Sequence, residues 1–315
     1  MIADGRQTVD DIAKKIGATK KTVKIDYEKM EKLGIITGAT THINYRLFGY
    51  KAVAHILITV DPQQANQLEE YLQKMPEVYS FYCRGIKGSI DVVVILNTIE
   101  QLNEIKDLIK MNFTITEIKT VIWTDVKEMN QNLAITDAIR KSTLQTPHSV
   151  FGAEIVKKSK NDIIDEIDQK IADKLAENGR ISMEALGREV GISADLARKK
   201  YKKLKDNGIL KITIQINLSK IGYRAMCIFF TVMSGENSLS IIQQISKIPD
   251  IISIMKTTGD YDLQIYSMVQ NIDQLLFIQE EISKIPGIRK IDLELSRFSE
   301  KLTKWPSPRQ YISTF

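Results

Sequence analysis

Residues 179–210 read GRISMEALGREVGISADLARKKYKKLKDNGIL, and this stretch predicts two short helices joined by a glycine-centred turn. Ser182 and Ser193 each precede one helix, where a serine side chain can accept a hydrogen bond from an amide of the first turn. Gly191 and Gly208 follow the helices, where glycine commonly ends them. An earlier helix is predicted by four apolar residues at three- and four-residue steps, Ile164, Ile167, Ile171 and Leu175.

Three helices in this order are typical of a helix-turn-helix domain, whose last helix enters the major groove of DNA. The last predicted helix is strongly basic, with six lysines or arginines against two aspartates between Ser193 and Asp206. Lysine-rich helix faces are often only solvated, so the charge alone leaves both interpretations open. The two capped helices favour DNA binding, in which lysines contact phosphates and a few residues early in the helix read bases.

A similar stretch occurs earlier in the chain. GRQTVDDIAKKIG, from Gly5, aligns with GRISMEALGREVG, from Gly179, at an offset of 174 residues, and Tyr27 aligns with Tyr201 at the same offset. After one residue of slack, Gly49-Tyr50 aligns with Gly222-Tyr223. Because glycines, prolines and apolar positions recur in order, the sequence predicts two tandem copies of one unit.

The first copy differs from the second in its helical part. No residues before Gly5 correspond to the helix predicted over 163–177, so the first copy is expected to lack this helix unless an upstream or other segment replaces it. Its last helix, from Thr19 to Lys32, has five lysines against three acidic residues and is expected to bind phosphate more weakly. The candidate DNA-binding residues are Lys20, Lys21, Thr22, Lys24, Ser193, Asp195, Arg198, Lys199 and Lys202.

A βαββαβ pattern follows each helical part. In the second copy, strands are expected at 225–233, 251–258, 262–268 and 287–295, with helices at 238–247 and 272–285. In the first copy, strands are expected at 51–60, 78–85, 91–97 and 117–124. Four strands with two helices on one face form a ferredoxin-like domain, whose other face a second such sheet could cover. The predicted fold class is therefore α+β, with a winged-helix-like helix-turn-helix and a ferredoxin-like domain, duplicated in tandem.

The loop TTGDYD, at 257–262, joins two of these strands and has two interpretations. It can be a simple hairpin turn, since glycine allows a positive φ and aspartate makes local hydrogen bonds. It can also hold the ammonium and carboxylate of a small zwitterion. The first copy has RGIKGSID at 84–91 instead, with two extra residues and Ser89 in place of Asp260. The candidate effector-binding residues are Thr257, Thr258, Gly259, Asp260, Asp262, Gly88 and Asp91.

These features divide the chain into predicted units. The helix-turn-helix domains are expected at 1–45 and 162–218, the sheet domains at 46–126 and 219–300, a linker at 127–161 and a tail at 301–315. No run approaches the roughly 18 apolar residues of a membrane-spanning helix, and the start of the chain is too polar for a signal peptide, so a cytoplasmic location is expected.

The sequence offers no catalytic or metal-binding pattern. The two cysteines, Cys83 and Cys227, have no spacing typical of a disulfide framework or a zinc site. The three histidines, His42, His55 and His148, are scattered and belong to no recognisable catalytic group. We therefore expect a protein that is not an enzyme and that needs no cofactor.

The ordered motifs IDEIDQKIADKLAENGRIS (163–182, with one preceding isoleucine omitted), GISADLARKKYKKLKDNGIL (191–210) and TTGDYDL (257–263) together resemble the Lrp/AsnC family of feast/famine transcription regulators. The resemblance implies an N-terminal helix-turn-helix joined to a ligand-sensing sheet domain, dimerisation through the sheets, higher oligomers, and amino acids as effectors. The implied partners are double-stranded DNA, an amino acid or related small effector, and the protein itself, both as an intramolecular pseudo-dimer and as a homo-oligomer. Family members normally contain one such unit, so a tandem pair departs from the pattern.

Two alternatives remain. Siroheme decarboxylases resemble the same family and have Arg- and His-rich stretches at the entry to the first strand of the sheet domain. The corresponding segments here contain His42, Arg46 and His55 in one copy and Arg224 in the other. The other alternative is a sensor or oligomerisation partner without DNA binding of its own, which the incomplete first helical unit makes possible for that half.

Overall fold

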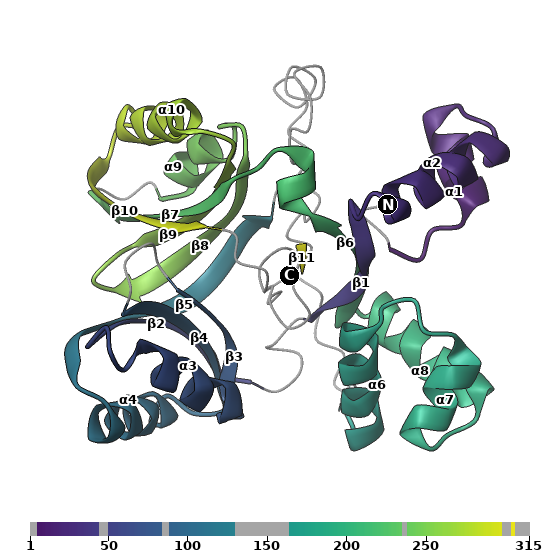
Figure 1. Ribbon diagram of the computed structural model, residues 1–315, viewed down its shortest axis with the longest axis horizontal. Coiled ribbons are helices and arrows are strands. Elements are labelled where there is room, and N and C mark those ends of the chain that lie inside the picture. The colour runs from purple at the N-terminus through teal and green to yellow at the C-terminus, as the bar shows by residue number, and fades with distance from the viewer. Residues whose placement is uncertain are drawn as a thin grey trace.

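The computed structural model describes residues 5–43, 50–83, 88–129, 164–234, 238–297 and 304–305. Figure 1 shows a mixed α+β protein with two helical units on one side and two sheet layers with their helices on the other. Most of the predicted linker and tail lies outside the described residues. In the described part of the chain, no helix has both the length and the apolar character needed to cross a bilayer.

The helical units form where the capping residues predict them. The first contains α1 (Val9–Ile16) and α2 (Lys20–Lys32), and the second contains α6 (Glu166–Glu177), α7 (Met183–Val190) and α8 (Ala194–Asp206). The structure confirms that Ser182 and Ser193 cap α7 and α8, each accepting a hydrogen bond from the amide three residues later. Thr8 and Thr19 cap α1 and α2 in the same way.

A two-stranded antiparallel ribbon joins the helical units. It pairs β1 (Ile36–Ile43), which follows α2, with β6 (Leu210–Asn217), which follows α8. Thr40 and Thr213 are direct partners at its centre, and both side chains are fully buried. The short strand β11 (Lys304–Trp305) pairs with the other edge of β6. The sequence patterns did not predict these strands.

The sheet region has two sets of four strands and two helices. The first set is β2 (Ala52–Val60), α3 (Ala65–Lys74), β3 (Val78–Cys83), β4 (Ser89–Leu96), α4 (Gln101–Asn112) and β5 (Ile115–Met129). The second, preceded by the 3-10 turn η1 (Leu218–Ile221), is β7 (Ala225–Met233), α9 (Ser238–Ile245), β8 (Ile251–Gly259), β9 (Leu263–Val269), α10 (Ile272–Ser283) and β10 (Ile288–Arg297).

The two sets form one sheet in the order β10-β7-β9-β8-β5-β2-β4-β3. Within each set the strand order is fourth, first, third, second, as expected for a βαββαβ unit. The sets meet where β5 pairs antiparallel with β8. β5 continues past residue 124, where the sequence analysis ends this strand, and Lys127 of the predicted linker pairs with Ile254.

The strands separate three apolar cores. One lies between the first four strands and α3 and α4, and another lies between the second four strands and α9 and α10. Figure 1 places these helix pairs on opposite outer sides, with the strands between them. The third core joins the inner faces, with Val53, Leu57 and Val93 from one set and Ile228 and Phe230 from the other. The sheet face that the sequence left to be covered is thus covered within the chain.

A buried polar cluster lies in this inner core. Gln264 of β9 accepts a hydrogen bond from the Trp123 indole nitrogen through Oε1, at 2.8 Å. Since the indole is only a donor, this bond orients the amide and directs its NH2 group at Nδ1 of His55. Nδ1 is then the acceptor, and the ring proton is on Nε2, which lies 3.7 Å from the Asp91 carboxylate. The side chains of His55, Asp91 and Gln264 are all fully buried.

Asp91 therefore lies elsewhere than the sequence alignment suggests. The alignment placed it at the end of a loop, opposite Asp262, whereas the structure places it inside β4, where it pairs with Leu57. Gln264 pairs with Phe230 at the corresponding position of the other set. The two extra residues before β4 shift the register, so the counterpart of Asp91 is Gln264.

Candidate nucleic-acid interface

The close crossing of α7 and α8 depends on a glycine within α7. A Cβ atom on Gly187 would lie 2.7 Å from the carbonyl oxygen of Ile192, which is closer than real Cβ contacts. Leu186 and Ala197 are fully buried where the two helices meet, and Leu175 of α6 belongs to the same core. This packing fixes the direction of α8, and the basic residues on its outer side are presented together.

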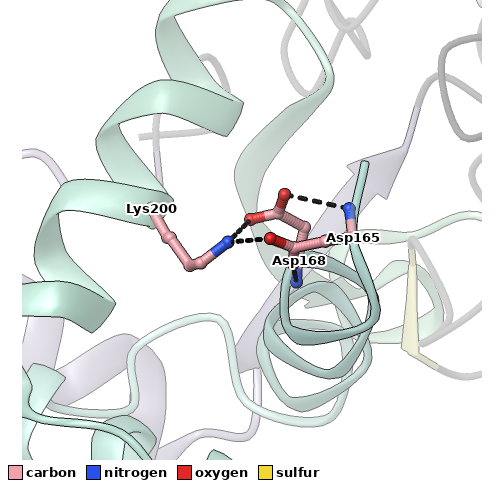
Figure 2. A network of polar contacts seen from close by, with 3 residues as sticks. All are labelled: Asp165, Asp168 and Lys200. Carbon is pink, nitrogen blue, oxygen red and sulfur yellow. Dashed lines mark hydrogen bonds and ion pairs between the residues drawn. The ribbon is translucent and has the colours of Figure 1, made fainter. Parts of the chain in front are cut away.

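One lysine of α8 holds the helix to α6 (Figure 2). Nζ of Lys200 lies 2.6 Å from Oδ2 of Asp165 and 2.9 Å from Oδ1 of Asp168. Asp165 caps α6, and Asp168 completes the capping box, with its side chain only 1% exposed. Lys200 thus belongs to an internal ionic network, although the sequence analysis counted it in the basic stripe that faces DNA.

The charges in this network stabilise one another. Burial lowers the pKa of Lys200, but the hydrogen bonds to Asp165 and Asp168 outweigh this effect, so its pKa is raised overall. The hydrogen bond from Lys200 is the main cause that holds the pKa of Asp165 below its ordinary value. All three groups are therefore charged near neutral pH, which couples the orientation of α8 to α6.

The outer side of α8 carries the predicted contact residues. Asp195, Arg198, Lys199 and Lys202 are exposed. A guanidinium nitrogen of Arg198 donates to Asp195 at 2.7 Å, and another lies 3.7 Å from Glu184 of α7. The two carboxylates hold this guanidinium on the surface. The hydroxyl of Ser193, also a predicted contact, is the helix cap instead.

The predicted residues of α2 are exposed as well. Lys20 pairs with Asp10 of α1, and Nζ of Lys24 lies 3.9 Å from Glu28. The hydroxyl of Thr22 is hydrogen-bonded to that of Thr19 at 2.9 Å, so it contributes to the helix cap. Lys21 is exposed beside them. The buried core of this unit is small and consists of Ile12, Ala13 and Val23.

Two arginines connect the helical units across the ribbon. Arg6, before α1, donates to the carbonyl oxygens of Gly179 at 2.8 Å and Ile181 at 2.6 Å, and its guanidinium lies over the ring of Tyr201 at 5.0 Å. These contacts cross from the first helical unit to the second.

Arg180, before α7, makes the converse contacts. It donates to the carbonyl oxygen of Gly5 at 2.8 Å and to the hydroxyl of Tyr27, and its guanidinium lies 4.9 Å from the centre of the Tyr27 ring. Burial is the largest cause that raises the pKa of Tyr27, to about 12, so the phenol stays protonated. Together, Arg6 and Arg180 form what we call the arginine clamp.

Glycines allow the clamp to close on the ribbon. The amide of Gly5 donates to Ile212 of β6, and the amide of Gly179 donates to Ala39 of β1, both at 2.8 Å. A Cβ atom on either glycine would approach ribbon backbone atoms to 2.9 Å. The sequence analysis aligned Gly5-Arg6 with Gly179-Arg180 but assigned them no role. Their recurrence at the same place in both stretches was the available signal.

The candidate effector loop is held largely by its own hydrogen bonds. The amide of Thr257 donates to the carbonyl oxygen of Asp262 at 2.9 Å, and its hydroxyl donates to that of Tyr261 at 2.7 Å. The Asp262 carboxylate accepts from the amide of Met233 at 2.7 Å. Thr258, Gly259 and Asp260 are exposed at the tip. Thr257 and Asp262 therefore shape the hairpin, and the tip is left for other contacts.

The loop tip lies against β5 of the first set. Gly259 has a φ of 122°, and a Cβ atom there would lie 2.9 Å from the carbonyl oxygen of Thr120. A hydrogen bond from Lys119 to Glu117 is the largest cause that raises the pKa of Lys119, and the charge of Asp260 adds to it. Gly88, the first-set candidate, lies at a φ of 90° before β4, where its carbonyl accepts from the amide of Val60.

Replacing Lys200 with methionine tests the network that holds α8. We expect the free energy of unfolding to fall by about 3 kcal/mol, because the buried carboxylate of Asp168 loses its partner ammonium. Lys202→Met, at an exposed position of the same helix, should change it by less than about 0.5 kcal/mol. Urea unfolding at pH 7 measures both effects, and equal values for the two variants would contradict this role.

The pH dependence follows from the lowered pKa of Asp165. Its stabilising contribution is present above the unfolded value, near 3.8, and is lost as the pH falls toward the folded pKa. The difference in stability between the wild type and Lys200→Met should therefore shrink below pH 3.8. A difference that stays constant to lower pH would show that the lysine acts through packing alone.

Comparison with known proteins assigns both parts of the second half. Residues 164–205 match the AsnC-type helix-turn-helix domain, and residues 227–306 match the Lrp/AsnC ligand binding domain. The HTH-type transcriptional regulator FL11 of Pyrococcus furiosus is 27% identical over 128 residues, which are 40% of this chain and 84% of that protein. The HTH-type transcriptional regulator Ptr1 of Methanocaldococcus jannaschii is 28% identical over 142 residues, which are 44% of this chain and 96% of that protein.

A solved structure resembles nearly the whole chain. The crystal structure of the siroheme decarboxylase NirDL aligns with a TM-score of 0.58 and 14% identity, covering 94% of this chain and 90% of that one. At this identity the similarity concerns the fold alone. By its family matches, the second half of the chain carries an AsnC-type helix-turn-helix domain followed by an Lrp/AsnC ligand binding domain, and its relatives include HTH-type transcriptional regulators.

Proposed function

We propose that this protein is a sequence-specific DNA-binding regulator of transcription in which one chain supplies a pair of helix-turn-helix units. The AsnC-type match at 164–205 supports DNA binding by α8. The arginine clamp is the observation that carries the paired arrangement, because it joins the two units through converse contacts. Such self-complementary contacts are characteristic of dimer interfaces with twofold symmetry.

The proposal includes a tandem duplication. Arg6 and Arg180 exchange equivalent contacts at an offset of 174 residues, and both four-strand sets have the same strand order. The proposed units are the helical domains at 1–45 and 162–218 and the sheet domains at 46–126 and 219–300. One chain would then do what a dimer does in proteins with a single unit. Larger assemblies of whole chains, and a cytoplasmic location, belong to the same proposal.

Binding would combine phosphate contacts with base contacts. Lys199 and Lys202, exposed along α8, would contact phosphates and make the affinity fall with salt. Arg198, held by Asp195, would present its guanidinium to base edges early in the helix. Lys20, Lys21 and Lys24 would have the corresponding places on α2.

Arg198→Ala and Lys199→Ala distinguish these two roles. Arg198→Ala should weaken binding to the specific site by about 1–3 kcal/mol and relax its sequence preference. Lys199→Ala should weaken binding to all sequences and reduce the slope of log K against log salt by about 1. Electrophoretic shift and footprinting on the region upstream of the protein's own coding sequence measure both.

Lys170→Ala is the matched control, because this residue is exposed on α6 and pairs with Glu166 of the same helix. It should leave DNA binding unchanged. Undiminished binding by Arg198→Ala and Lys199→Ala, or wild-type binding without sequence preference at moderate salt, would contradict the proposal.

We propose further that a small amino-acid-like effector binds at the tip of the 257–262 loop. Asp260 is exposed there, and its charge interacts with that of Lys119 on β5. These opposite charges suit the ammonium and carboxylate of a zwitterion. The match of residues 227–306 to a ligand binding domain supports the location.

Asp260→Asn tests the effector site. The affinity for the effector should fall about tenfold or more, because a hydrogen bond to a charged group contributes about 1.5–3 kcal/mol. Calorimetry with the common amino acids measures the affinity, and Asp273→Asn, exposed on α10, is the control. Heat from no amino acid, or equal affinity in wild type and Asp260→Asn, would leave the loop as a hairpin turn.

The second candidate function is that of a siroheme decarboxylase-like enzyme, which the whole-chain similarity in fold to NirDL favours. Among the described side chains, His55 is the only imidazole, and its complete burial keeps it from a bound tetrapyrrole. We therefore infer that the protein is not an enzyme. Titration with an iron porphyrin is the discriminating test, and a saturable shift of the Soret band would revive the enzymatic alternative.

A third candidate is a first half that serves only as sensor or oligomerisation partner. Its helical unit has a small core and leaves Ile16 and Ile25 more than half exposed. Footprinting separates this candidate from the paired arrangement, because a first half without DNA contacts would leave protection at the α8 site alone.

A further inference from the structure

We infer that the protein recognises a non-palindromic DNA site with two unlike halves, one read by α8 and the other by α2. This inference rests on the proposed DNA binding and concerns the nature of the site. It follows from the different chemistry of two helices that the fold holds at equivalent places.

The equivalence of α2 and α8 is fixed by their surroundings. The caps Thr19 and Ser193 lie 174 residues apart, as do Val23 and Ala197, which bury the same turn of each helix. Gly17 and Gly191 end the preceding helices with φ values of 68° and 77°. The alignment of the two helices therefore needs no gap, and exposed residues can be compared position by position.

The first exposed turns carry opposite charges at a decisive position. Asp195 of α8 corresponds to Lys21 of α2, and Arg198 corresponds to Lys24. Asp195 accepts a hydrogen bond from Arg198 at 2.7 Å, which fixes the planar guanidinium. Lys21 cannot accept such a bond, because an ammonium group is only a donor. The side chain of Lys24 is instead 3.9 Å from Glu28.

These differences change which bases each helix can read. An arginine makes paired hydrogen bonds to O6 and N7 of guanine, and an aspartate accepts from N4 of cytosine. The Asp195–Arg198 pair therefore suits a G·C-containing half-site. The lysines of α2 present flexible single-point donors, which favour guanine and phosphate with less directional constraint. The α8 half-site should be well defined and the α2 half-site more tolerant.

The later turns differ in the same sense. Glu28 and Glu31 of α2 occupy the places of Lys202 and Lys205 of α8. Carboxylates at these positions oppose the approach of phosphates, so α2 has less sequence-independent attraction to DNA. Because the arginine clamp joins the units, α2 is nevertheless delivered to the duplex whenever α8 binds.

A palindrome suits this pair poorly. It presents the same base edges to both helices, so one helix always meets a half-site chosen for the other. Each mismatched base pair costs about 1–3 kcal/mol, and the best site therefore has unlike halves.

In vitro selection from a randomised duplex, with the full chain, tests the inference. The wild type should enrich a bipartite sequence with one defined G·C-containing half and one less constrained half. We expect it to bind this sequence at least tenfold more tightly than a palindrome of the defined half, which is about 1.4 kcal/mol.

The triple variant Lys20→Ala, Lys21→Asp, Lys24→Arg gives α2 the exposed first turn of α8. It should reverse the preference and enrich the palindrome. The matched control Lys29→Ala, on the same helix, should keep the asymmetric preference. All four positions lie on α2 away from its buried Val23.

The outcomes separate this inference from the proposed function. No enriched sequence at moderate salt would overturn DNA-specific function itself. Enrichment of a palindrome by the wild type, or of the defined half without a second half, would overturn the asymmetric site and leave DNA binding intact.

Discussion

The arrangement of the molecule depends on the β1–β6 ribbon and the arginine clamp that closes on it. Each helical unit alone is a short bundle, and the first has only a small buried core. The ribbon gives both units a common support, because β1 and β6 leave α2 and α8 directly and pair with each other. Guanidinium groups suit the connection, since Arg6 and Arg180 bind carbonyl oxygens and lie over an aromatic ring at the same time.

A second constraint acts between the sheet sets. Asp91 and Gln264 occupy equivalent positions, and His55 lies between them. Two copies of the first set would bring two carboxylates together in this buried core, and two copies of the second would have no imidazole to join their amides. Buried polar groups are expensive unless all are satisfied. The cluster thus favours pairing of unlike sets, which is consistent with a chain whose two helical units also differ.

The sequence predicted best what depends on neighbouring residues. Ser182 and Ser193 cap helices because a cap needs only the next turn, and β7 has its predicted bounds because a buried strand is a continuous apolar run. The ribbon could not be predicted in this way, since its strands alternate polar and apolar residues and pair across more than 170 positions. The role of Lys200 was hidden for a similar reason, because Asp168 reaches it only through tertiary packing. Asp91 was misplaced because a register shift within a strand leaves no mark on its composition.

The central claim is that one chain places two joined helix-turn-helix units on DNA. Hydroxyl-radical footprinting of the wild type and of an Arg6→Ala, Arg180→Ala variant tests it most directly. The wild type should protect two patches on one face of the duplex, and the variant should keep protection at the α8 half-site while losing it at the other. A single protected patch in the wild type, or two unchanged patches in the variant, would contradict the account.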